Sequence, residues 1–264
     1  MRTWKKAATV AAMGTTLAAL PTMAATAAPL AAIASPIAPY GGIGAEWNAK
    51  GGAAGFLGAA QDNEYDVAGV PGARMEDFQG GQIYWSGPTG AHEVHGDIAV
   101  KYRTAAGGPT TYGLPLTDEI TTPDGVGRFN HFQGGSIYWT PSTGAHTVYG
   151  AIKAEWAATG WEQGILGYPT SDEGNALGNA NVGPGRYNNF QHGVIYWSPA
   201  TGAHEVHGAI LGAWAGRGYE QGALGFPTMD ERDIFGSGGR ESWFQAGYIS
   251  WVNGKITVLV DPHN

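Results

Sequence analysis

A twelve-residue segment occurs four times in this chain, and this repetition limits the fold more than any other feature. Each copy begins with arginine, contains Phe-Gln followed by a glycine-containing turn, and ends at tryptophan, as in RYNNFQHGVIYW. The tryptophans are spaced by 54, 58 and 54 residues. Such a period predicts a repeat protein whose neighbouring units bury one another. The arginines are Arg74, Arg128, Arg186 and Arg240, and the tryptophans are Trp85, Trp139, Trp197 and Trp251.

Each repeat unit is predicted to contain one short helix and three antiparallel strands. Apolar residues four apart, such as Ile152 and Trp156, lie on one face of a helix. The Phe-Gln turn predicts a hairpin, and the loop PATG predicts a second one. The fold class is therefore an α+β repeat protein in which each unit is a helix plus a three-stranded meander. The predicted units are 41–96, 97–150, 151–208 and 209–260.

The hairpin loops predict which residues share a face of the sheet. Counting from Asn253-Gly254 pairs Trp251 with Ile256, and counting from PATG pairs Trp197 with His204. Because side chains alternate along a strand, this register puts tryptophan and histidine on one face, toward the helix of the same unit. We expect these histidines to be packed and hydrogen bonded. A three-histidine metal site is the alternative, but the chain has no HxxxH spacing. The histidines are His92, His146 and His204.

The repeated arginine is predicted to form an ion pair with an acidic pair earlier in its unit. In the third unit this pair is Asp172-Glu173, and a loop of variable length separates it from Arg186. An arginine–carboxylate pair would close that loop, and binding of an anionic ligand by the arginine is the alternative. Adjacent carboxylates point apart on an extended chain, so they do not resemble a glycosidase pair. The chain also lacks GxSxG, P-loop and HExxH motifs, and we expect no catalytic residue, cofactor or metal.

The sheet face that carries the repeated tyrosine is predicted to bind sugars. Tyrosine rings stack on sugar rings, and neighbouring carboxylates, amides and imidazoles bind hydroxyl groups. The alternative is that this face packs on the next unit, and exposure of the tyrosines distinguishes the two. The predicted ligand-binding residues are Tyr84, Tyr138, Tyr196, Glu93, Glu205, His95, Tyr149, His207, Asp77, His131, Asn189 and Trp243.

The beginning of the chain predicts secretion. Residues 1–28 have a basic start, an apolar run and small residues near Ala25, which is typical of a signal peptide, with a retained membrane anchor as the alternative. Residues 29–40 are rich in proline and alanine and are predicted to be a linker. We expect no membrane span after signal cleavage. The net charge of −8 argues against nucleic acid as a partner and permits a neutral polysaccharide.

The turns GILGYPTSDE and GALGFPTMDE, with the arginine-led segment and the TGAHxVxG elements, resemble the LGFP repeat family. The resemblance covers residues 41–260, but the first unit has LGAAQDNE and the last has NGKITVLV. It implies a secreted, non-catalytic actinobacterial protein associated with the cell wall. The implied ligand is arabinogalactan or peptidoglycan glycan, and the implied protein partner is a wall enzyme. It also implies units arranged around a pseudo-symmetry axis, as a disc or propeller-like module. The alternatives are a self-associating envelope scaffold without sugar binding and a cell-wall hydrolase.

Overall fold

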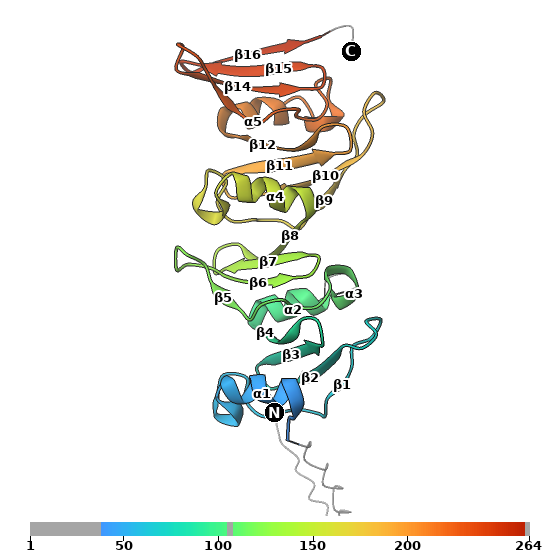
Figure 1. Ribbon diagram of the computed structural model, residues 1–264. Coiled ribbons are helices and arrows are strands. Elements are labelled where there is room, and N and C mark those ends of the chain that lie inside the picture. The colour runs from blue at the N-terminus through green and yellow to red at the C-terminus, as the bar shows by residue number, and fades with distance from the viewer. Residues whose placement is uncertain (1–37, 105–107, 262–264) are drawn as a thin grey trace, which may run out of the picture. The chain divides into compact units, whose positions relative to one another are not determined.

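The repeats fold into four antiparallel sheets and five α-helices in the computed structural model, which describes residues 38–104 and 108–261 (Figure 1). The strand order follows the chain within each sheet. Sheet 1 contains β1 (Tyr65–Asp66), β2 (Arg74–Asp77), β3 (Gly81–Ser86) and β4 (Gly90–His95). Sheet 2 contains β5 (Ile120–Thr121), β6 (Arg128–Phe132), β7 (Gly135–Thr140) and β8 (Gly144–Tyr149). Sheet 3 contains β9 (Gly174–Ala176), β10 (Gly185–Asn189), β11 (Gly193–Ser198) and β12 (Gly202–His207). Sheet 4 contains β13 (Arg232–Ile234), β14 (Gly239–Phe244), β15 (Gly247–Val252) and β16 (Lys255–Val260).

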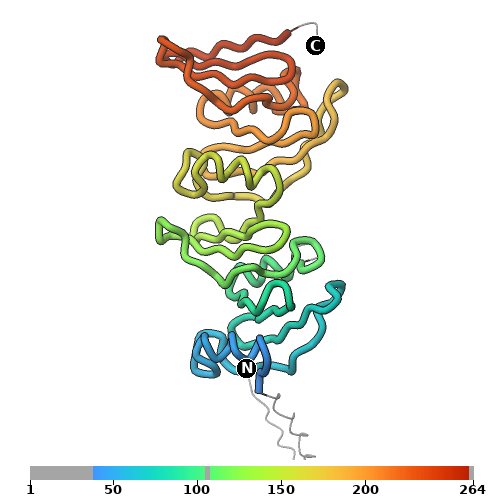
Figure 2. The backbone as a smooth tube through the Cα atoms, viewed as in Figure 1, coloured from blue at the N-terminus to red at the C-terminus, as the bar shows by residue number. Residues whose placement is uncertain are grey.

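Four of the five helices lie where the apolar pairs predicted them, and the short helix Gly108–Tyr112 was not predicted. Ile152, Trp156, Ile210 and Trp214 are all buried, as expected for one helix face turned to the core. The backbone passes directly from the last strand of sheets 1 to 3 into the next helix (Figure 2). A single left-handed glycine makes each of these links, for example Gly150 at φ +56°, a conformation that other residues rarely adopt. The helices are α1 (Gly41–Ala49), α2 (Gly96–Thr104), α3 (Gly108–Tyr112), α4 (Gly150–Ala158) and α5 (Gly208–Ala215), with 3₁₀ turns at Gly52–Ala54, Trp161–Gln163 and Tyr219–Gln221.

Each sheet has four strands, so the prediction of three-stranded meanders is wrong by one strand. The additional strand is short and comes from the loop between the acidic pair and the arginine. In sheet 3, for example, Asn175 of β9 pairs with Arg186 of β10. These strands have only two or three residues, which is too short to show an alternating pattern in the sequence.

The register of the last hairpin is predicted correctly only in sheet 4. Trp251 pairs with Ile256 there, as expected. In sheet 3, however, His204 pairs with Tyr196, and Trp197 pairs with Ala203. Sheets 1 and 2 have the same register as sheet 3. The loop between Ser198 and Gly202 has three residues and ends at a left-handed glycine (φ +84°), which is a standard three-residue hairpin.

This correction of one residue exchanges the two faces of the last strand. The histidines predicted to lie beside tryptophan share the face of the tyrosine instead. The residues predicted beside the tyrosine, Glu93, Glu205, His95, Tyr149 and His207, lie on the face that carries isoleucine and tryptophan.

Both faces of sheets 1 to 3 pack against helices. Helix α2 contacts β3 and β4 of sheet 1 as well as β7 and β8 of sheet 2. Helix α4 contacts β8 and also β11 and β12, and α5 contacts β11 and β12 together with β15 and β16. We call each interface between consecutive sheets, including its helix, a seam: the first contains α2, the second α4 and the third α5.

The repeated tyrosines are buried in these seams, so the expectation that they form an exposed face is wrong. Tyr84, Tyr138 and Tyr196 are only 2%, 4% and 6% exposed. Tyr138 meets Trp156 of the following helix edge-on, with ring centroids 4.7 Å apart. The tyrosine face therefore packs on the next unit, as the alternative interpretation held.

The helix–sheet contacts do not bear on the predicted signal peptide and linker, on the membrane span or on the closure of the units. The predicted signal peptide and linker residues 29–37 lie outside the described residues. None of the helices between residues 38 and 261 that the structure describes is long and apolar enough to cross a membrane. Closure of the units into a disc or propeller stays a prediction. The contacts of α2, α4 and α5 each join consecutive sheets, and they do not test closure.

Candidate functional site

A pocket with the same wall residues occurs in all three seams. Each pocket is lined by the first turn of the seam's helix, the last residue of the preceding strand, and the glutamate, arginine and tryptophan of the next unit. We call them the Trp139, Trp197 and Trp251 pockets, and their cavity volumes are about 510, 210 and 260 Å³. Their shared lining residues are His95, Glu119, Arg128 and Trp139, then Tyr149, Glu173, Arg186 and Trp197, then His207, Glu231, Arg240 and Trp251.

The tryptophan rings form the apolar wall of these pockets. All three are half-buried, so part of each indole remains accessible. In the Trp139 pocket the indole N–H donates to Asp97 Oδ2 at 2.7 Å, which fixes the ring over the start of α2. Small residues, Ala151 and Ala209, line the other two pockets. The tryptophans were predicted to be structural, and the structure gives them an accessible edge as well.

The arginine and glutamate form the ion pair that the sequence predicted. Arg186 Nε donates to Glu173 Oε1 at 2.6 Å, and Arg240 pairs with Glu231 at the same distance. In unit 1 Arg74 donates to Glu64 at 2.7 Å, whereas Arg128 lies 3.8 Å from Glu119. The guanidinium groups are partly exposed while the carboxylates are nearly buried, so the arginines face the pockets. The predicted ion pair is thus present in all four units, although in the second unit Arg128 and Glu119 are 3.8 Å apart.

Besides the tryptophan and the arginine–glutamate pair, each pocket is lined by the last residue of the preceding strand, which is histidine in two pockets and tyrosine in one. His207 Nδ1 lies 2.7 Å from Glu205 Oε2, and its Nε2 lies 3.4 Å from Glu231 Oε1. The hydrogen bond to Glu205 raises the pKa of His207, although burial opposes the shift. In the Trp197 pocket, Tyr149 accepts a hydrogen bond from Arg186 at 2.8 Å.

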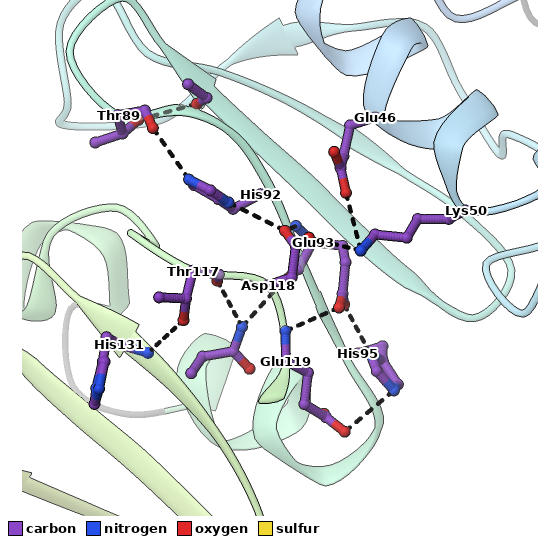
Figure 3. A network of polar contacts seen from close by, with 12 residues as sticks. Glu46, Lys50, Thr89, His92, Glu93, His95, Thr117, Asp118, Glu119 and His131 are labelled. Carbon is purple, nitrogen blue, oxygen red and sulfur yellow. Dashed lines mark hydrogen bonds and ion pairs between the residues drawn. The ribbon is translucent and has the colours of Figure 1, made fainter. Parts of the chain in front are cut away.

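The first seam shows how this last strand residue is supported (Figure 3). His95 of β4 contacts Glu93 and Glu119 at 2.7 and 3.3 Å, and the backbone N–H of Glu119 donates to Glu93 Oε1. The hydrogen bond to Glu93 raises the pKa of His95, with burial opposing it. Glu93, which was predicted to bind ligand, is therefore buried and holds the pocket's histidine in place.

The predicted histidines of the last strand connect consecutive units. His92 Nδ1 and Lys50 Nζ both contact Asp118 of the next unit, at 3.1 and 2.6 Å (Figure 3). Burial raises the pKa of Asp118, but the bonds from Lys50 and His92 outweigh it and hold the pKa below its usual value. His204 contacts Asp230 at 2.9 Å, and His146 lies 3.7 Å from Asp172. Nε2 of each histidine also contacts a backbone carbonyl, of Thr89, Thr143 or Thr201, at 2.8 to 3.1 Å, so all three are hydrogen bonded as predicted. The aspartates are seam residues that were predicted only to close the loop.

The remaining predicted ligand-binding residues do not join the pockets. Asp77 accepts a hydrogen bond from Tyr65 at 2.5 Å, and His131 lies 2.6 Å from Ser136. Asn189 is exposed at the end of β10, and Trp243 is exposed on sheet 4. Among residues 38–104 and 108–261, no group of three or more histidine, aspartate or glutamate side chains is placed to hold a metal ion.

Three consecutive segments of the chain match the sequence profile of the LGFP repeat, at residues 57–110, 113–164 and 166–222. Together they cover more than half of the chain. The chain belongs to the LGFP repeat family. Each matched segment runs from the turn of one LGFP unit through its sheet and into the following helix. Each LGFP segment therefore spans the connection from one sheet to the helix of the following seam, whereas all four strands of sheet 4 lie beyond the matches. A comparison with curated proteins gave no match.

Proposed function

We propose that this protein is a secreted, non-catalytic cell-wall module that binds neutral polysaccharide, such as arabinogalactan or peptidoglycan glycan, in its tryptophan pockets. The observation that carries the proposal is the recurrence of one pocket with the same chemistry in three seams. LGFP repeats suggest a repeat module of cell-surface proteins, and a wall enzyme is the protein partner we propose.

The lining chemistry suits an uncharged sugar. A partly accessible indole can stack on the C–H face of a pyranose, while arginine, glutamate and histidine or tyrosine bind hydroxyl groups. Within each pocket the arginine and glutamate compensate each other's charge. The net charge of −8 disfavours an anionic polymer.

Three pockets on one chain favour a polymer over a single small sugar. When one pocket is occupied, the linked polymer has a high effective concentration at the others, so weak sites combine into useful retention. A catalytic site normally occurs once, whereas these pockets recur, and this supports a binding role.

Filling two pockets from exposed positions tests the proposal. Ala151 and Ala209 are exposed residues in the first turns of α4 and α5, and both line a pocket. We expect the double substitution Ala151→Leu/Ala209→Leu to weaken retention on purified cell wall by about tenfold or more, because it leaves one pocket of three. Retention is measured by co-sedimentation, with soluble arabinogalactan as competitor.

The matched control is Ala154→Leu, which places the same side chain at another exposed position of α4, outside the Trp197 pocket. It is expected to keep full retention. Equal loss in both variants would argue against the pockets. No retention of the unmodified protein would favour the second candidate, an envelope scaffold, which the burial of Tyr84, Tyr138 and Tyr196 in the seams supports.

A further inference from the structure

We infer that the outer face of sheet 4 is a separate glycan-binding surface, where Trp243 and Tyr248 form a stacking platform for a neutral saccharide. The inference rests on the proposed function and adds a site that differs from the tryptophan pockets. One face of sheet 4 packs on α5 through Ile249, with Trp251 and Ile256 partly buried against the same cluster. The opposite face carries the platform.

This outer face corresponds to the face that the following helix covers in sheets 1 to 3. In sheet 4 it is accessible in the part of the chain that the structure describes: Trp243 is 38% exposed and Leu259 is 53% exposed. Large apolar side chains in a contiguous exposed group are uncommon on a folded protein and indicate a binding surface.

Sheet 4 lacks the residues that hold a helix on this face. In sheet 3, Tyr196 pairs with His204, and the tyrosine ring packs edge-on against Trp214 of α5 at 4.8 Å. At the same positions sheet 4 has Ser250 paired with Thr257. Because the tyrosine ring that contacts the helix is absent, this face differs from the helix-binding faces of sheets 1 to 3. We therefore do not infer that a helix from a second copy of the chain binds here.

The aromatic residues of sheet 4 lie at a different place on the face. Trp243 pairs with Tyr248, and Tyr248 pairs with Leu259, so the three form one row across β14, β15 and β16. The corresponding pair in sheet 2 is His131 and Ser136, and in sheet 3 it is Asn189 and Val194. The exchange of small and polar residues for two aromatic rings is specific to the last sheet.

The geometry of the row suits a sugar chain. The Trp243 and Tyr248 rings have centroids 5.1 Å apart and are tilted by 35° to each other. Since strands in a sheet are about 4.8 Å apart, a row across three strands extends about 10 Å, enough to contact two consecutive sugar rings. Both aromatic side chains are rigid and lose little entropy when they bind.

The charges of this face favour an uncharged ligand. Arg232 donates to Glu241 Oε1 from Nε and Nη2, at 2.9 and 2.8 Å, so these two charges compensate each other. Lys255 is the remaining charged residue among the strand positions of this face, at the other end of β16 from Leu259. The hydroxyl group of Thr257, which is exposed on β16 between Lys255 and Leu259, is suited to hydrogen bonds with sugar hydroxyls.

The substitution Trp243→Ala tests the platform. We expect about a fivefold or greater loss of affinity for purified arabinogalactan, because truncating a tryptophan that anchors an interface is typically that costly. Phe235→Ala is the matched control, since Phe235 is fully exposed and follows β13 in the same unit. The control is expected to bind as the unmodified protein does. Circular dichroism of both variants establishes that they are folded.

The outcomes separate this inference from the proposed function. If the unmodified protein binds, the pocket variants weaken binding and Trp243→Ala does not, the platform is refuted and the pockets stand. If no form of the protein binds the polysaccharide, both proposals are refuted. Sedimentation velocity adds a third outcome: self-association that Trp243→Ala abolishes, without glycan binding, would identify the face as an interface between copies and overturn the inference.

Discussion

Replacing Trp156 with alanine is expected to lower the free energy of unfolding by about 3 to 5 kcal/mol, as for other large buried aromatic side chains. Trp156 is fully buried in the second seam and contacts both sheets there. Its ring lies 4.7 Å from Tyr138 of sheet 2 and 5.5 Å from Phe190 of sheet 3, and its N–H donates to the carbonyl of Gly167. Removing it leaves a cavity between two sheets and an unpaired buried carbonyl. Denaturant unfolding followed by circular dichroism measures the effect.

Trp47 provides a matched control for this prediction. It occupies the same position in α1, stacks on Phe78 at 6.1 Å and donates to the carbonyl of Gly58. It is only half-buried, because the contacts of α1 are with β3 and β4 of sheet 1. Trp47→Ala should therefore cost clearly less than Trp156→Ala. Equal costs would show that contact with the preceding sheet contributes little to the seam.

The helices and long strands follow from the sequence because their signals are local. Ile152 and Trp156 show the helix period within five residues, and Asn253-Gly254 specifies its own turn. Such features do not depend on what packs against them. The same reasoning correctly paired Arg186 with an acidic residue, since the repeated charges occur at both ends of one loop.

The assignment of last-strand residues to the two faces of each sheet could not be predicted from local signals alone. The loop before Gly202 can be counted as three or four residues, and only its left-handed backbone decides between them. A difference of one residue moves Glu205 and His207 from the tyrosine face to the tryptophan face. The tryptophan pockets depend on this register. Their residues could be singled out from the sequence, but the fact that they line one pocket could not be predicted.

The burial of the tyrosines has a further physical reason. A sheet with polar residues on one face is usually solvated there, and Tyr196 with His204 fits that expectation. Here the polar partners come from the next unit: Asp230 meets His204 at 2.9 Å, and in the first seam Asp118 meets His92 at 3.1 Å. These contacts join residues 26 positions apart, which no local pattern reveals.

Replacing Glu76 with glutamine is expected to stabilise the protein at neutral and alkaline pH. Glu76 is 1% exposed, and neither carboxylate oxygen has a hydrogen-bond partner. Burial, with smaller contributions from Asp62 and Glu64, raises its pKa from the ordinary 4.5 to about 7. At the same place in the next two units, Asn130 and Asn188 donate to carbonyls of the preceding unit, Glu93 O and Thr147 O.

The pH dependence of this effect has a defined sign. Below pH 4.5 the glutamate is protonated in both the folded and the unfolded state, so its ionisation costs no stability. As the pH rises from 4.5 to about 7, the unfolded state loses the proton first and the folded state is progressively destabilised. The penalty reaches a plateau of at most about 3.4 kcal/mol above pH 7, since one pKa unit corresponds to about 1.36 kcal/mol.

Glu76→Gln should therefore raise the free energy of unfolding by about 1 to 3 kcal/mol at pH 8 and change it little at pH 4. Denaturant unfolding at both pH values measures the difference. The reciprocal substitution Asn130→Asp places a carboxylate at the equivalent buried position, and it should be more destabilising at pH 8 than at pH 4. A Glu76→Gln gain of equal size at both pH values would mean that side-chain shape, rather than a buried charge, limits the stability of the first sheet.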